Sequence, residues 1–158
     1  MMPYYSLEYA VFLLYKERVI NINKTIAKIR RYKELKADII DTDIKLQELE
    51  DEMLGITGQG TEERTGKTYK ITSTVEQQAD KYMEKKEDLI RKRSIKEREV
   101  KRIENAISVL TEEEREVIEL AHIHLKKYWK IENQLHKSYS RLKQIENEAA
   151  EKMEKYLS

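Results

Sequence analysis

The sequence has no cysteine, a single proline and only four glycines among its 158 residues. Without cysteine, the chain has no disulfide, no thiolate metal ligand and no cysteine nucleophile, and a reducing compartment suits it. The proline is Pro3, and all four glycines lie between Gly55 and Gly66. Because proline and glycine are the strongest breakers of regular structure, long helices are predicted on both sides of this glycine window.

Long apolar runs are also missing. The only one of note is "YAVFLLY", from Tyr9 to Tyr15, and charged residues follow it directly. It is far shorter than the roughly 20 residues of a membrane-spanning helix. The start of the sequence has neither the basic segment nor the small-residue cleavage site of a signal peptide. We therefore expect a soluble, cytoplasmic protein with no membrane partner.

Charge of one sign is not in excess either. Charged residues make up 39% of the chain, apolar residues another 39%, and the net charge is +1. This composition is typical of exposed helices that each bury one stripe, and any contact with nucleic acid must rest on local basic patches. Two basic stretches, Lys16 to Lys36 and Lys81 to Arg102, fit such contacts or the solvated flanks of a coiled coil equally well.

Two helical arms are predicted around a loop at residues 55–72. Apolar residues recur at three- or four-residue steps in both arms, so an antiparallel hairpin over residues 30–109 would bury both stripes. Lys86, Arg93 and Lys96 fall on the second stripe and weaken its middle. Ser73 and Glu76 form a capping box that predicts the start of the second arm, and "TYKIT" in the loop is a weak strand signal.

A more compact unit is predicted after the hairpin, over residues 110–158. Thr111 and Glu114 form a second capping box, and the apolar faces that follow are broad and short. The expected fold class is therefore all-α: a long antiparallel, coiled-coil-like helical hairpin followed by a small helix-turn-helix bundle. Residues 1–29 form a helical extension whose stripe includes Val19, Ile22, Ile26 and Ile29.

Motifs for catalysis or cofactor binding are weak. The "GKT" at Gly66 resembles the end of a P-loop, but Gly60 is one residue too far away and a charged helix precedes the loop. His122 and His124 lie about 200° apart on a helix, so they cannot share a metal, and we expect surface or partly packed histidines. We predict no enzyme activity, no cofactor and no metal site.

The segment "HKS", His136 to Ser138, interrupts a helical pattern on both flanks. Ser138 can cap a new helix, so the pattern predicts a helix-turn-helix with a second helix at about residues 139–157. Leu142 and Ile145 would face inward. The side chains placed for DNA bases or phosphates are Lys130, Lys137, Ser138, Tyr139, Ser140, Arg141, Lys143, Gln144 and Asn147. On spacing alone, a solvated amphipathic helix fits equally well.

The segment "IENAISVLTEEEREVIELAHIH" with "YWKIENQLHKSYSRLKQIENEAAEKM" resembles the ArpU/RinA-like regulators of phage late genes. Their C-terminal unit is similar to the fourth region of bacterial sigma factors. The resemblance aligns Tyr128 and Ile131 with the first helix of the motif, and Ser138 with the cap of the recognition helix. It extends to "RRYKELK" and "TSTVEQQADKYMEKKEDL", which are similar to the family's charged hairpin. Three positions depart from the family pattern. Leu125 replaces a turn glycine, Lys126 replaces a leucine, and Glu132 replaces an alanine and so needs a partner or an altered helix crossing.

The resemblance implies a sequence-specific transcriptional regulator of phage or prophage genes in a bacterial host cell. Double-stranded DNA would be its partner, with RNA polymerase or a second copy bound through the hairpin. Two alternatives stay open. One is a small terminase subunit that binds phage DNA as an oligomeric ring. The other is a protein-interaction module whose helix-turn-helix no longer binds DNA, which the nine basic and ten acidic residues between Thr111 and Ser158 favour.

Overall fold

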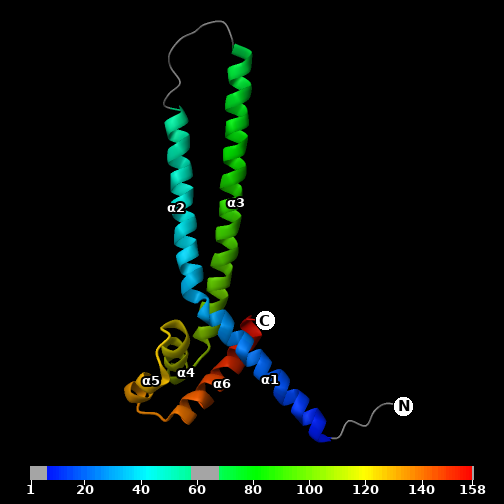
Figure 1. Ribbon diagram of the computed structural model, residues 1–158, viewed down its shortest axis with the longest axis vertical. Coiled ribbons are helices and arrows are strands. Elements are labelled where there is room, and N and C mark those ends of the chain that lie inside the picture. Colours follow the sequence, from blue (N-terminus) through cyan, green and yellow to red (C-terminus); the bar gives the residue numbers. More distant parts are fainter. Residues whose placement is uncertain (1–6, 58–67, 158) are drawn as a thin grey trace, which may run out of the picture. The chain divides into compact units, whose positions relative to one another are not determined.

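The computed structural model describes residues 7–57 and 68–157, and none of these residues forms a β-strand. The all-α prediction is confirmed. The helices are shown in Figure 1: α1 (Leu7–Arg30), α2 (Tyr32–Thr57), α3 (Thr68–Ser108), α4 (Glu112–Ile118), the π-helix η1 (Glu119–Ile123), α5 (Tyr128–Leu135) and α6 (Tyr139–Leu157). None of the described helices is both long and apolar enough to cross a membrane.

The loop predicted at residues 55–72 is too long at both ends. Gly55 lies inside α2, and α3 already begins at Thr68. The strand signal in "TYKIT" and the capping box at Ser73 are therefore wrong. One glycine costs a helix only about 1 kcal/mol, which neighbouring turns offset. Residues 58–67 lie outside the described residues. They include Gly60 and Gly66, the two glycines compared with a P-loop.

The chain divides into two compact units that differ from the predicted division. One unit comprises Met1–Lys33 and Val100–Ser158, and the other comprises Glu34–Glu99. The predicted separation of residues 1–29 from the C-terminal bundle therefore does not describe this structure. The physical reason is that α1 packs against α6 and against η1, so it completes the bundle instead of extending from it.

The unit of residues 34–99 contains most of α2 and α3. Three ion pairs join the two helices: Lys86 with Glu50 at 2.8 Å, Arg93 with Asp43 at 2.7 Å, and Lys96 with Asp38 at 2.8 Å. Residue numbers rise along one helix as they fall along the other, as in an antiparallel pair. The three basic residues on the apolar stripe thus have counter-charges, which fix the register more than they add stability.

The core of the other unit lies between α4, η1, α5 and α6. Ile131, Leu142 and Ile145 are at most 1% exposed and form one apolar cluster with residues of α4 and η1. Tyr128 and Leu135 pack at the edge of this cluster. The inward faces predicted for α5 and α6 are therefore confirmed.

The second half of α1 is part of the same core. Ile22 and Ile26 form an apolar cluster with Ala150 of α6, and Ile29 is fully buried. Arg18 forms an ion pair with Glu151 on α6. The face of α1 that carries Ile22 and Ile26 thus packs against α6.

Candidate nucleic-acid interface

The helix-turn-helix is formed by α5 and α6. Helix α5 ends at Leu135, and His136 has φ 52° and ψ 42°, in the left-handed region. A left-handed residue satisfies the last carbonyl groups of a helix and redirects the chain. Helix α6 then begins at Tyr139. The break that the sequence predicts at "HKS" is present.

Two side chains cap the first turn of α6. The Ser138 hydroxyl accepts a hydrogen bond from the backbone N–H of Arg141 at 3.3 Å, as its position predicts. Glu132, on α5, accepts another from the backbone N–H of Tyr139 at 2.7 Å. The partner that a glutamate at this position needs is thus present, because the carboxylate satisfies an amide that the helix itself cannot bond.

The turn before α5 contains a left-handed backbone conformation at Leu125, which a residue with a Cβ disfavours. Leu125 has φ 52°, in the left-handed region that favours glycine. The backbone N–H of Lys126 bonds the carbonyl of Leu120 at 2.9 Å and closes η1. The left-handed conformation costs a residue with a Cβ about 1–2 kcal/mol more than it costs glycine. The backbone of this turn is therefore strained at Leu125.

The outer face of the first turns of α6 carries Ser140, Arg141 and Gln144, which are all exposed. They project away from the buried face of Leu142 and Ile145, since residues one or two positions apart point to different sides of a helix. The amide of Gln144 donates to Glu148 at 3.0 Å, one turn further along. Asn147 is half-buried.

An acidic residue of α4 binds two of the basic residues predicted to contact DNA. The Lys137 ammonium lies 2.7 Å from the Glu113 carboxylate, and the Arg141 guanidinium lies 3.8 Å from it. The hydrogen bond from Lys137 lowers the pKa of Glu113 below its ordinary value. Glu113 thus competes with any phosphate for these two side chains.

Aromatic side chains stand beside the turn. Tyr139 is 52% exposed and packs edge-on against Tyr128, with 5.2 Å between ring centroids. Trp129 is 57% exposed, and the Lys130 ammonium lies 5.4 Å from its ring centroid. This corner of the unit therefore presents large apolar surface next to the predicted phosphate contacts.

Lys143 does not project outward as predicted. Its ammonium lies 2.6 Å from Oε1 of Glu146, whose side chain is only 2% exposed. The Tyr128 hydroxyl donates to the other oxygen of the same carboxylate. Lys143 is thus engaged in a buried cluster and is less available for DNA than its neighbours.

His122 completes this cluster, so the expectation of a surface or partly packed histidine is wrong at this position. Its side chain is 2% exposed, and Nε2 lies 3.2 Å from Oε2 of Glu146, outside regular hydrogen-bond geometry. Arg30 of α1 donates to Nδ1 at 3.3 Å. The other ring nitrogen, Nε2, thus faces the carboxylate. His124 and His136 are exposed.

The cluster is arranged to keep Glu146 ionised. Burial alone would raise the pKa of this carboxyl, but the close contact with His122 and the hydrogen bonds from Lys143 and Tyr128 outweigh burial and lower it to about 2. Burial and the bond to Glu146 raise the pKa of Tyr128. A buried carboxylate needs several polar partners. The contacts of this cluster link α1, η1, α5 and α6. Spacing gave no signal for the cluster, because its members come from four separate elements.

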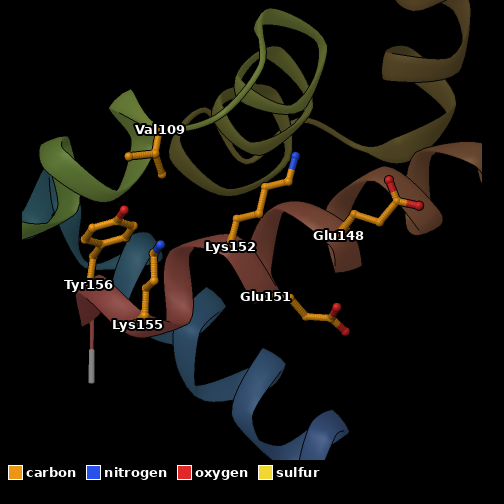
Figure 2. Close-up of a pocket in the computed structure, with 6 residues that line it drawn as sticks. All are labelled: Val109, Glu148, Glu151, Lys152, Lys155 and Tyr156. Carbon is orange, nitrogen blue, oxygen red and sulfur yellow. The ribbon is translucent and has the colours of Figure 1, made fainter.

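The second half of α6 borders a groove of about 650 Å³ (Figure 2). It is lined by Val109, Glu148, Glu151, Lys152, Lys155 and Tyr156. Lys152 forms an ion pair with Glu114 at 2.5 Å, and Glu151 forms one with Arg18. These ion pairs join α4 and α1 to α6.

Among the described residues, no group of three or more histidines and carboxylates is placed to hold a metal ion. Comparison of the chain with protein-family models, with curated proteins and with solved structures finds no match.

Proposed function

We propose that the chain is a sequence-specific DNA-binding regulator of phage or prophage transcription, with α6 as its recognition helix. The observation that carries this proposal is the helix-turn-helix of α5 and α6, whose second helix is capped at its start and exposes Ser140, Arg141 and Gln144 on its first turns. In this motif the N-terminal residues of the second helix reach base edges in the major groove.

The roles of the side chains follow from their chemistry. Arginine bonds the two acceptors of guanine and glutamine the donor and acceptor of adenine, so Arg141 and Gln144 are assigned to bases. Lys130 and Lys137, at the turn, are assigned to phosphates. Ser138 and Tyr139 form the hydrogen bonds at the start of α6 and are assigned to the DNA backbone beside it. Ser140 adds a hydroxyl donor.

The hairpin is the proposed contact for RNA polymerase or a second copy in the bacterial cytoplasm. Several of its large apolar side chains are exposed instead of buried between α2 and α3: Ile40, Ile44, Leu54, Met83, Ile90 and Ile95. These side chains would supply the apolar contacts of the proposed interface.

The test is capture of fragmented phage and host genomic DNA on the immobilised full-length protein, followed by sequencing. We expect a shared sequence motif among captured fragments and its loss in the double variant Arg141→Ala/Gln144→Ala. The matched control, Arg102→Ala/Gln77→Ala, removes the same residue types from exposed positions of α3 and should keep the motif. Capture without any motif contradicts sequence-specific reading.

A second function, a protein-interaction module that no longer binds DNA, is favoured by one arrangement. Glu113 binds Lys137 and Arg141, and Trp129 and Tyr139 expose large rings at the same corner. Partly neutralised basic residues with neighbouring aromatic rings are typical of a protein interface. Failure to capture DNA at low salt favours this function.

A further inference from the structure

The first half of α1 is apolar on every side, and its large side chains are mostly exposed among the described residues. The segment Tyr9 to Tyr15 has seven consecutive uncharged residues, which complete about two turns of a helix and so project in all directions. Its large side chains are 44–66% exposed, and Leu7 is 84% exposed. By contrast, Ile22, Ile26 and Ile29 of the same helix are buried.

A helix that is apolar all round is normally buried. A lipid surface does not fit, because a helix that lies on a membrane needs a polar face, and Tyr9 to Tyr15 has none. The segment is also too short to span a bilayer, and none of the described helices can do so. A protein partner can cover more than one side of the segment, because one of its helices and the rest of its fold can contact the segment together.

We infer that this segment is a dimer interface, in which α1 pairs antiparallel with α1 of a second copy of the chain. The pairing is centred on Phe12, which is 53% exposed. Glu8, Phe12 and Lys16 lie four residues apart and therefore share one face of the helix. The Lys16 ammonium leans over the Phe12 ring, 5.7 Å from its centroid, so its charge lies on that face.

The charges on this face are self-complementary. In an antiparallel pair with its two-fold axis at Phe12, each Glu8 stands opposite Lys16 of the other copy, because both are four residues from the axis. Tyr9 and Tyr15 are likewise equidistant from the axis and meet across it. A parallel pair in register would instead place Glu8 against Glu8 and Lys16 against Lys16.

The segment offers apolar side chains to a partner on more than one side. Nine large apolar residues between Leu7 and Ile20 are each 37–84% exposed. A standard interface buries ~800 Å² per partner, so the dimer should also include contacts between α1 and the body of the other copy. A dimer through α1 is independent of whether α6 binds DNA, so the two proposals fail separately.

The test is the mass of the full-length protein by light scattering and sedimentation velocity, in the absence of DNA. We expect a dimer for the wild type and a rise of about tenfold or more in the dissociation constant for Phe12→Glu. The matched control is Leu125→Glu, which adds the same charge at a residue of the same unit that is 65% exposed, and it should remain dimeric. Circular dichroism verifies that both variants keep their helices.

Charge reversal tests the antiparallel arrangement. Glu8→Lys alone and Lys16→Glu alone should each weaken the dimer, and the double variant should restore it. A monomeric wild type overturns the inference, as does a dimer that Leu125→Glu dissociates while Phe12→Glu does not. A double variant weaker than both single variants overturns the antiparallel pairing. A monomer that sediments with phosphatidylglycerol vesicles assigns the segment to lipid instead.

Discussion

The Lys137 ammonium lies 2.7 Å from the carboxylate of Glu113, so a side chain proposed to hold a DNA phosphate already has an acidic partner. Arg141 lies within reach of the same carboxylate. In the proposed complex, DNA has to displace Glu113 from both basic residues. The proposal therefore implies that Glu113 lowers the affinity of this unit for DNA.

The first prediction follows from that competition. Glu113→Gln should raise affinity severalfold for selected and random DNA alike, and should steepen the dependence of log K on log salt by about one unit. The charge-matched control, Glu112→Gln, changes an exposed carboxylate in the same turn of α4 and should have a smaller effect. Fluorescence anisotropy at two salt concentrations makes the measurement. Equal effects of the two variants contradict a specific role for Glu113.

The second prediction concerns the cap that Glu132 provides. Glu132→Ala removes the acceptor for the Tyr139 amide and should lower the free energy of unfolding by about 0.5–2 kcal/mol. Glu132→Gln keeps an oxygen at the same place and should lose less. Denaturant unfolding gives the size of the loss, and amide exchange at Tyr139 locates it. Equal stability of the alanine variant and wild type refutes the capping role.

Leu125 carries the third prediction. Leu125→Gly relieves a left-handed backbone at an exposed position and should stabilise the unit by about 0.5–1 kcal/mol after the entropy cost of glycine. Lys127→Gly is the control, because Lys127 has φ −67° and gains nothing from glycine. Thermal or urea unfolding compares the two, and a loss of stability in Leu125→Gly contradicts the strain.

The core packing gives the fourth prediction. Ile131→Asp or Leu142→Asp places an unpaired carboxylate among fully buried side chains, which costs several kcal/mol and is comparable with the stability of a small domain. Either variant should unfold the unit. Leu54→Asp, at a residue of α2 that is 69% exposed, should not. Unchanged amide protection in Ile131→Asp rules out this packing.

Much of this arrangement follows from local signals in the sequence. Thr111 and Glu114 form the predicted capping box, and the burial of Leu142 and Ile145 follows from helical spacing alone. Periodicity and caps report on residues within one or two turns, so they predict such features well. The loop bounds failed because Gly55 is tolerated inside a helix that its neighbours stabilise.

Contacts between distant segments have no such local signal in the sequence. The contact of Arg30 with His122, and of both with the carboxylate cluster of Glu146, depends on how α1 packs against η1 and α6. The partner of Glu132 lies across a turn whose geometry the sequence predicts only as a break. Pairings of this kind depend on tertiary structure, and spacing cannot specify them.

The fifth prediction is a pH dependence that comes from Glu146. Its pKa of about 2 lies below the ordinary value of 4.5, so the folded state favours the carboxylate. Its contribution to stability is fully present above pH 4.5 and is lost as the pH falls toward 2, in total about 3 kcal/mol. The difference in unfolding free energy between wild type and Glu146→Gln should therefore shrink over that range. Glu148→Gln should keep the acid-side slope of the wild type, and a constant difference for Glu146→Gln contradicts the assignment.

The central claim is that α6 reads DNA through Arg141, and binding of wild type and Arg141→Ala to a selected sequence and to random duplex tests it most directly. Loss of a bidentate base contact should cost Arg141→Ala about 1–3 kcal/mol on the selected sequence and little on random DNA. Lys137→Ala, as a phosphate control, should weaken both about equally and flatten the salt dependence by about one unit of slope. If the wild type binds neither duplex at low salt, or Arg141→Ala loses the same affinity on both, α6 does not read sequence.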